Sequence, residues 1–222
     1  TISSQPASQT VTSGSSVTFT VSASGTPTPT YQWKKNGSSI SAATSASYTI
    51  ASTTSGSAGT YTVVVTNSAG SITSTGAVLT INTSPAFTTQ PSSQTVIAGS
   101  SVTFAAAAGG SPSPTFQWKK NGTSISGATS PSYTISSVTT GNAGSYTVVA
   151  TNSVGAATSN AATLTVNPTP VAPVFSIQPV DQSVIAGSGV TFIAAASGTP
   201  SPAFQWMKDG VAIAGATTAS YT

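Results

Sequence analysis

Three segments of the chain repeat one another almost end to end, and this repetition is the strongest constraint on the fold. The segments begin ISSQPASQTVTSG, FTTQPSSQTVIAG and FSIQPVDQSVIAG, and each continues to a tryptophan preceded by glutamine. Trp33, Trp118 and Trp206 therefore recur after 85 and then 88 residues. A period of this length indicates one structural unit per repeat, so the chain is expected to form consecutive copies of one domain.

The repeats predict the domain boundaries. We expect a first domain at residues 1–83, a second at 84–168, a proline-rich linker at 169–173 and an incomplete third domain at 174–222. The third copy reaches only SYT, and the counterparts of GTYTVVVTN and GAVLTI in the first copy do not follow. We expect the polypeptide to continue beyond residue 222; the alternative is that a strand from another copy fills the gap by β-augmentation.

The residue pattern within each repeat predicts β-strands. Serine and threonine make up more than a third of the chain, a composition that would also suit a disordered or mucin-like protein. In SVTFTVSA, however, Val17, Phe19 and Val21 alternate with hydroxyl residues. Alternation with period two, rich in β-branched and aromatic residues, is typical of half-buried strands, so we favour a folded chain whose hydroxyl residues face solvent.

Many short strand patterns, separated by turn signals and without a helical stretch, predict an all-β fold of tandem sandwiches. In the first copy the patterns are SVTFTVSASG, TYQWKKNG, SYTI, GTYTVVVTN and GAVLTI, which we name strands B, C, E, F and G. Asn-Gly at 36–37 and 121–122 and Asp-Gly at 209–210 suit two-residue type I′ hairpins, which need positive φ at both positions.

At these residues the chain resembles the bacterial immunoglobulin-like repeats, of the intermediate set, that are strung together in large secreted or surface proteins. The marks of the resemblance are the strand C tryptophans Trp33, Trp118 and Trp206 and the strand F tyrosines Tyr61 and Tyr146. It covers two complete units and the first half of a third. It implies immunoglobulin-like sandwiches whose core carries these side chains.

The chain departs from that family where the resemblance implies an intersheet disulfide. Those positions hold Val21 with Val63, Ala106 with Val148, and Ala194 with a partner beyond residue 222, and the chain has no cysteine. A disulfide typically adds ~2–4 kcal/mol, and we expect aliphatic packing beneath the tryptophan to recover part of it. A bacterium that exports an unfolded chain is the expected setting.

The corner between strands E and F also departs from the family. Its usual aspartate is Ser57 in the first copy and Asn142 in the second. We still expect Tyr61 and Tyr146 to direct their hydroxyls back to the backbone, as in a tyrosine corner.

The composition argues against catalysis, metal binding and nucleic-acid binding. There is no histidine, cysteine or glutamate, and the only acids are Asp181 and Asp209, which the other copies do not share. Acid–base pairs, nucleophilic triads and zinc or calcium sites therefore lack their residues, and we expect no catalytic residue, metal or cofactor. Five lysines, confined to one hairpin per repeat, form no stripe for nucleic acid, and no run is long enough for a membrane span.

We therefore expect an extracellular, secreted or cell-surface structural protein, acting as a stalk, a filament or an adhesin shaft. Its partners would be the neighbouring domains, with possible self-association into fibres. Val64 and Val149, apolar on the outward register of strand F, could contact a neighbour or simply be exposed. The alternative is a recognition module for carbohydrate or protein, appended to a secreted enzyme, with weak glycan or cell-surface contact. Loops between strands B and C that nearly repeat (SGTPTPT, GGSPSPT, SGTPSPA) favour the structural role.

Overall fold

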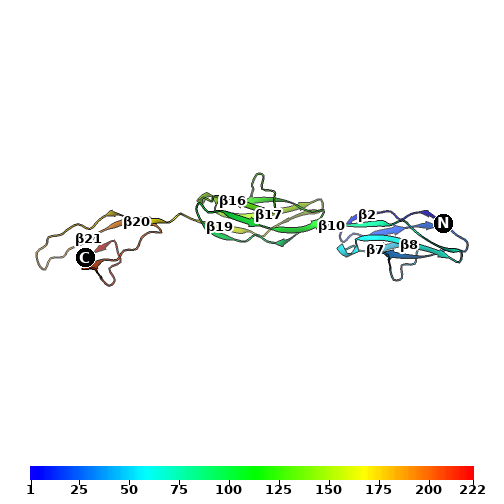
Figure 1. The fold of residues 1–222 in the computed structure, drawn as a ribbon, viewed down its shortest axis with the longest axis horizontal. Coiled ribbons are helices and arrows are strands. Elements are labelled where there is room, and N and C mark those ends of the chain that lie inside the picture. The colour runs from blue at the N-terminus through cyan, green and yellow to red at the C-terminus, as the bar shows by residue number, and fades with distance from the viewer. The chain divides into compact units, whose positions relative to one another are not determined.

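The computed structural model describes all residues from Thr1 to Thr222, and its strands follow the three repeats. In the first repeat one layer consists of two antiparallel pairs, β1 with β4 and β3 with β7. These strands span Ile2–Ser4 (β1), Ser22–Ala23 (β4), Val17–Thr20 (β3) and Ser47–Ile50 (β7). Figure 1 shows them in blue to cyan.

The second layer of the first repeat carries strands C, F and G. Strand F (β8) pairs on one side with strand C (β5), which continues into the short hairpin strand β6, and on the other with β9 and β10. Strand β2 adds to β10 in parallel. The bounds are Gln9–Thr12 (β2), Thr30–Lys35 (β5), Ser38–Ser39 (β6), Gly59–Asn67 (β8), Gly70–Thr73 (β9) and Ala77–Thr89 (β10).

Alternation of side chains decides which residues fill the space between the layers. In β3, Val17 and Phe19 are buried while Thr18 and Thr20 are exposed. The predicted strand B is divided at Val21, whose backbone N–H donates to the carbonyl of Ala46, the residue just before β7. Strand B is thus divided between β3, which pairs with strand E, and β4, which pairs with the first strand.

The second repeat builds the same arrangement from equivalent segments. The C-terminal part of β10 pairs with β13, and β12 pairs with β16, while the larger sheet has the order β11-β19-β17-β14-β15 with β18 on β17. The bounds are Gln94–Ile97 (β11), Val102–Ala105 (β12), Ala107–Ser111 (β13), Thr115–Lys120 (β14), Thr123–Ser124 (β15), Ser132–Ile135 (β16), Gly144–Asn152 (β17), Gly155–Thr158 (β18) and Ala162–Asn167 (β19).

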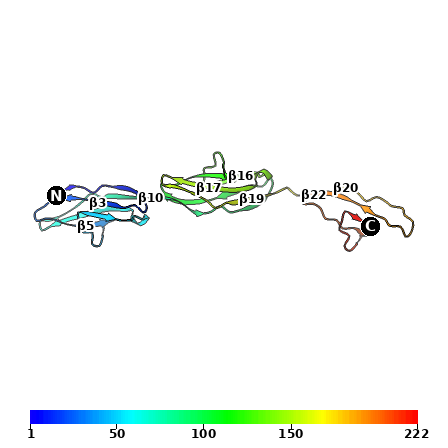
Figure 2. The same ribbon diagram turned by 180° about the vertical axis from the view of Figure 1, so that it is seen from behind.

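The third repeat contains three separate pairs of strands. Strand β20 pairs with β22, β21 with β25, and β23 with β24. The bounds are Val171–Ile177 (β20), Phe192–Ile193 (β21), Ala195–Thr199 (β22), Met207–Lys208 (β23), Val211–Ala212 (β24) and Ser220–Tyr221 (β25). The pairing of β20 with β22 can be followed in Figure 2. No counterpart of strands F and G lies against this repeat among residues 1–222.

The hairpins have the geometry that the sequence predicts. Asn36 and Gly37 have φ of 47° and 84°, and Asp209 and Gly210 have 50° and 80°, as a type I′ turn requires. The E–F corners form single 3-10 turns, Ser55–Ser57 (η1) and Thr140–Asn142 (η2), where the sequence predicted no helix of any kind.

Strands extend into the segments that the sequence predicts to separate the domains. Strand β10 runs without interruption through the predicted boundary at residues 83 and 84, because its first part pairs within the first repeat and its last part pairs with β13. In the predicted linker 169–173, β20 already begins at Val171, so three of its five residues lie in a strand. The domain boundaries themselves stay predictions.

Candidate functional site

The aromatic core of the first repeat closes the space between the two layers. Trp33 has no exposed surface, and its indole Nε1–H donates to the carbonyl of Ser45 at 2.9 Å. Tyr61 from β8 stacks on Phe19 from β3, with ring centroids 4.7 Å apart and an interplanar angle of 22°. The indole is tilted against Phe19 at 6.1 Å. Phe19 of strand B therefore contacts both the Trp33 ring of strand C and the Tyr61 ring of strand F, and so links the two layers.

The second repeat reproduces this core with the same dimensions. Trp118 is fully buried and donates its indole N–H to the carbonyl of Ser130 at 2.9 Å. Tyr146 stacks on Phe104 at 4.7 Å and 22°. The ring separations and angles of the two repeats are nearly the same, which indicates that the same few side chains determine each core.

Aliphatic residues occupy the positions where the resemblance places a disulfide. Val21 and Val63 are buried, the latter with no exposed surface, and Val63 lies directly opposite Trp33 in the β5–β8 pairing. In the second repeat Ala106 is 6% exposed and Val148 is fully buried opposite Trp118. These side chains join the aromatic core, so burial of apolar surface stabilises the positions where the resemblance implies a disulfide.

A buried serine closes a gap in strand G, which the sequence reasoning did not find. Strand G is interrupted between β9 and β10, and an interruption of this kind leaves ladder groups of the neighbouring strand unpaired. The hydroxyl of Ser74 accepts from the buried backbone N–H of Val63 at 3.0 Å and donates to the carbonyl of Thr75 at 2.9 Å. Ser159 binds Val148 in the same way. The only sequence signal is that a serine recurs here after 85 residues.

Polar side chains between β1 and β2 also bind backbone N–H groups beside the same interruption of strand G. Gln5 accepts from the backbone N–H of Thr75 at 3.0 Å, and Gln90 accepts from Asn160 at 2.9 Å. Ser8 accepts from the backbone N–H of Val78 at 2.9 Å. Strand G is therefore positioned by side-chain acceptors as well as by its ladder.

The predicted tyrosine corner forms in the first repeat. The Tyr61 hydroxyl donates to the carbonyl of Ser57 at 2.7 Å. The Ser57 hydroxyl in turn accepts from the backbone N–H of Thr54 at 3.1 Å. A neutral hydroxyl is therefore the side-chain acceptor at this turn, at the position where the resemblance implies an aspartate. Burial raises the pKa of the Tyr61 phenol above its ordinary value, and the neighbouring Tyr48 raises it further.

The corner of the second repeat uses an amide in place of the hydroxyl. Asn142 accepts from the backbone N–H of Thr139 at 2.7 Å and from its hydroxyl at 3.0 Å. Burial, and secondarily the nearby Tyr133, raise the pKa of the Tyr146 phenol. Different neutral side chains thus cap equivalent turns.

Trp206 differs from its two counterparts, and the expectation that it is a core residue holds only in part. It keeps the same internal hydrogen bond, from Nε1 to the carbonyl of Thr218 at 3.0 Å, but its side chain is only half-buried. The reason is that Trp33 and Trp118 are covered by strand F, and no strand covers Trp206.

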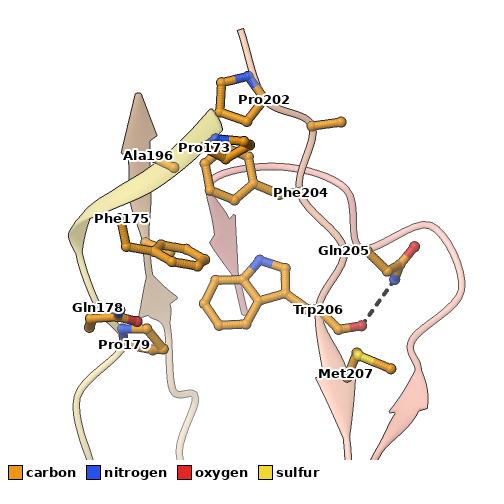
Figure 3. A pocket seen from close by; sticks show the side chains of 12 residues that line it. Pro173, Phe175, Gln178, Pro179, Ala196, Pro202, Phe204, Gln205, Trp206 and Met207 are labelled. Carbon is orange, nitrogen blue, oxygen red and sulfur yellow. Dashed lines mark hydrogen bonds between the residues drawn. The ribbon is translucent and has the colours of Figure 1, made fainter. Parts of the chain in front are cut away.

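The uncovered side of the third repeat forms an apolar groove of about 450 Å³. Figure 3 shows the rings of Phe175, Phe204 and Trp206 around it, with Pro173 and Pro179 at its margin. Phe175 is 53% exposed. Sequence reasoning placed the aromatic residues inward and did not predict that these would be open to solvent.

The charged side chains do not gather into a reactive site. Lys35 donates from Nζ to the carbonyl of Gly56, and Asp209 lies in the hairpin turn before Gly210. No group of three or more potential metal ligands is present. No helix has the length and apolar character needed to cross a bilayer. What the arrangement offers chemically is buried apolar surface, neutral hydrogen bonds and one open apolar groove.

Comparison with known proteins agrees with this geometry. The immunoglobulin domain family matches residues 1–67 and 84–152. Mouse Roundabout homolog 1 is 36% identical over 197 residues, which are 84% of this chain and 12% of the relative. Mouse Peroxidasin homolog is 34% identical over 222 residues, which are 94% of this chain and 15% of the relative. The chain thus spans about an eighth of the length of these relatives.

A solved structure shares the same architecture. The I67–I69 fragment from the I-band of titin aligns with a TM-score of 0.59 and 26% sequence identity, covering 96% of this chain and 80% of that one. The chain belongs to the immunoglobulin domain family, and the predicted all-β fold of tandem immunoglobulin-like domains is confirmed. The expected bacterial origin gains no support, since the relatives named here are from mouse.

Proposed function

We propose that the chain is an extracellular structural array whose immunoglobulin-like domains set distance and carry load, as a stalk, a filament or an adhesin shaft. The observation that supports it most is the equality of the two complete cores. Each is closed by the same rings at the same separations, and each lacks the residues that catalysis needs. Repetition of one closed unit provides length and mechanical resistance and leaves specific chemistry to other parts of a protein.

The pairing of strands gives this proposal a physical basis. Strand F lies between strands C and G in each complete repeat, so it cannot leave without breaking two ladders and exposing the tryptophan. The hydrogen bond from the Tyr61 hydroxyl to the carbonyl of Ser57 joins the start of strand F to the turn that precedes it. We expect each complete repeat to unfold in one cooperative step under force.

Single-molecule stretching of the chain between its ends tests this function. We expect two unfolding events of equal added length, each roughly 25–30 nm from about 85 residues at ~3.6 Å per residue. Tyr61→Phe should lower the force of one event and leave the other unchanged. A chain that extends smoothly, without two equal events, would refute the load-bearing role.

A recognition module is the second candidate, and the open groove of the third repeat favours it. The groove presents three aromatic rings, which suit an apolar partner or a stacked sugar. Measurement against an array of glycans distinguishes the two: selective glycan binding that Trp206→Ala abolishes would support recognition. Self-association is a separate matter. Electron images of the native material would show an ordered fibre if chains pack, and isolated beads if they do not.

A further inference from the structure

We propose that Asn36 and Asn121 are sites of spontaneous covalent modification, at which the folded hairpin converts a side-chain amide to a carboxylate. The backbone nitrogen of the following glycine is the nucleophile, ammonia is the leaving group and water is the co-reactant. The inference goes beyond the structural role proposed above, because it assigns a chemical reaction to the tips of two hairpins, β5–β6 and β14–β15.

The side-chain amide of Asn36 is held with its carbonyl polarised. The backbone N–H of Thr60 donates to Oδ1 at 2.9 Å, and the N–H of Asn36 donates to the carbonyl of Thr60 at 2.8 Å. A donor on a carbonyl oxygen stabilises the negative charge that develops there when a nucleophile attacks the carbon. Nδ2 has no hydrogen-bond partner and the residue is exposed, so ammonia can leave into water.

The nucleophile is the backbone nitrogen of Gly37, and the peptide that contains it is free to turn. Neither the carbonyl of Asn36 nor the N–H of Gly37 has a hydrogen-bond partner. Apart from its chain neighbours, nothing lies within 4 Å of the position of a Cβ at Gly37. Rotation of this peptide plane interchanges type I′ and type II′ turns, both of which close two-residue hairpins. The rotation brings the nitrogen toward Cγ of Asn36 and leaves the two bonds to Thr60 in place.

The reaction is balanced by water alone. The Gly37 nitrogen gives its proton to hydroxide and bonds to Cγ of Asn36; the Cγ–Nδ2 bond breaks, and the leaving nitrogen takes a proton from water and departs as ammonia. The product is a cyclic imide, which water then opens. Attack of water at Cγ gives aspartate, and attack at the backbone carbonyl carbon of Asn36 gives isoaspartate. Nothing is oxidised or reduced in either step.

The second hairpin has the same arrangement. The N–H of Ser145 donates to Oδ1 of Asn121 at 2.8 Å, and the N–H of Asn121 donates to the carbonyl of Ser145 at 2.8 Å. Gly122 has φ of 82° and open space around its Cβ position. Each complete repeat therefore carries one such site.

The third repeat shows that this hairpin accepts the aspartate product. Asp209 and Gly210 have φ of 50° and 80°, close to the 47° and 84° of Asn36 and Gly37. Conversion of both asparagines to acids adds two negative charges, which lowers the net charge of the chain from +3 to +1. Isoaspartate, in contrast, lengthens the main chain of a two-residue loop, so it should disturb the pairing of β5 with β6.

Other asparagines in turns lack these features. The Nδ2 groups of Asn67 and Asn152 donate to the carbonyls of Pro27 and Pro112, both at 2.8 Å, so their leaving groups are engaged. Each of the two is followed by a serine, whose side chain hinders approach of the backbone nitrogen. We therefore expect the reaction to select residues 36 and 121.

Incubation of the folded full chain in mildly alkaline buffer, prepared with water enriched in heavy oxygen, tests the proposal. Peptide mapping by mass spectrometry should show residues 36 and 121 gaining a carboxyl with heavy oxygen over days, with isoaspartate among the products. Asn67 and Asn152 should stay intact. Near-ultraviolet circular dichroism of the same samples shows whether the aromatic cores remain folded during the reaction.

Gly59→Ala separates activation by the backbone donor from simple mobility of the hairpin. A Cβ at Gly59 would lie 2.7 Å from Oδ1 of Asn36, so the substitution displaces the amide from Thr60. Conversion at Asn36 should slow about fivefold, the rate equivalent of one hydrogen bond, while Asn121 in the same chain keeps its rate. Gly70→Ala, whose Cβ would meet nothing within 4 Å, should change neither rate.

Three results would overturn the proposal. The first is that residues 36 and 121 stay amides in the folded chain. The second is that any other asparagine converts as fast as they do. The third is that Gly59→Ala leaves the rate at Asn36 unchanged or raises it, which would mean that mobility and not the bond from Thr60 governs the reaction.

Discussion

Removing the buried hydroxyl at position 74 should destabilise the first repeat and leave the second unchanged. Ser74→Ala deletes the acceptor of the Val63 N–H, 3.0 Å away, together with the bond from the hydroxyl to Thr75. The N–H belongs to a residue with no exposed side-chain surface, so water cannot replace the serine without disturbing the core. A buried donor left without a partner costs about 1–3 kcal/mol.

The second repeat provides an internal control for this experiment. Each kcal/mol lowers the melting temperature of a domain of this size by about 4–8 °C, so a loss of about 1–3 kcal/mol should lower the melting temperature of the first repeat by about 4–24 °C. Scanning calorimetry of the full chain should then resolve two transitions. Ser159→Ala should move the other transition by a similar amount, because Ser159 binds Val148 at the same 3.0 Å. If Ser74→Ala shifts melting no more than Ser71→Ala, whose side chain is exposed, the role assigned to the hydroxyl is wrong.

Three further perturbations test other parts of the account. The folded-state pKa of Tyr61 is raised, so the stability that the neutral phenol contributes is complete below the ordinary pKa of 10.0 and is lost as pH rises through the higher folded value. Urea unfolding at several pH values should therefore show the free energy of unfolding falling above about pH 10, and Tyr61→Phe should reduce that fall. Gly59→Ala should lower the free energy of unfolding by at least about 1 kcal/mol more than Gly70→Ala does. Both glycines have positive φ, but only at Gly59 would an added Cβ lie 2.7 Å from the side chain of Asn36 in the hairpin. Equal urea midpoints for the two variants would count against this contact. Val63→Thr should cost about 1–3 kcal/mol in the same assay, whereas Val64→Thr, partly exposed on the neighbouring position, should change stability by less than about 0.5 kcal/mol.

Alternation and turn chemistry made the strands predictable. Strand F was expected at GTYTVVVTN and is observed at Gly59–Asn67, because its inward residues repeat at every second position and a tight turn follows. The hairpin at Asn36 was predictable because few residues adopt positive φ at low cost. These features depend on local sequence alone.

Features that depend on distant partners could not be predicted. Strand B is divided at Val21 and its two parts pair with different strands, β3 with β7 and β4 with β1, while the continuity of β10 follows from pairing on both sides of the predicted boundary. Ser74 looks like any other serine in a serine-rich chain, and only the structure shows that its hydroxyl completes a ladder. The half-buried state of Trp206 likewise depends on whether a strand F is present beside it.

The central claim is that rings and aliphatic side chains under strand F close each complete repeat without a disulfide. Hydroxyl-radical footprinting of the native chain, read residue by residue with mass spectrometry, tests it most directly. Trp33 and Trp118 have no exposed surface and Trp206 is half-buried, so Trp206 should be oxidised many times faster than the other two. Equal oxidation of all three indoles would mean that the first two sandwiches are open, and would contradict the account.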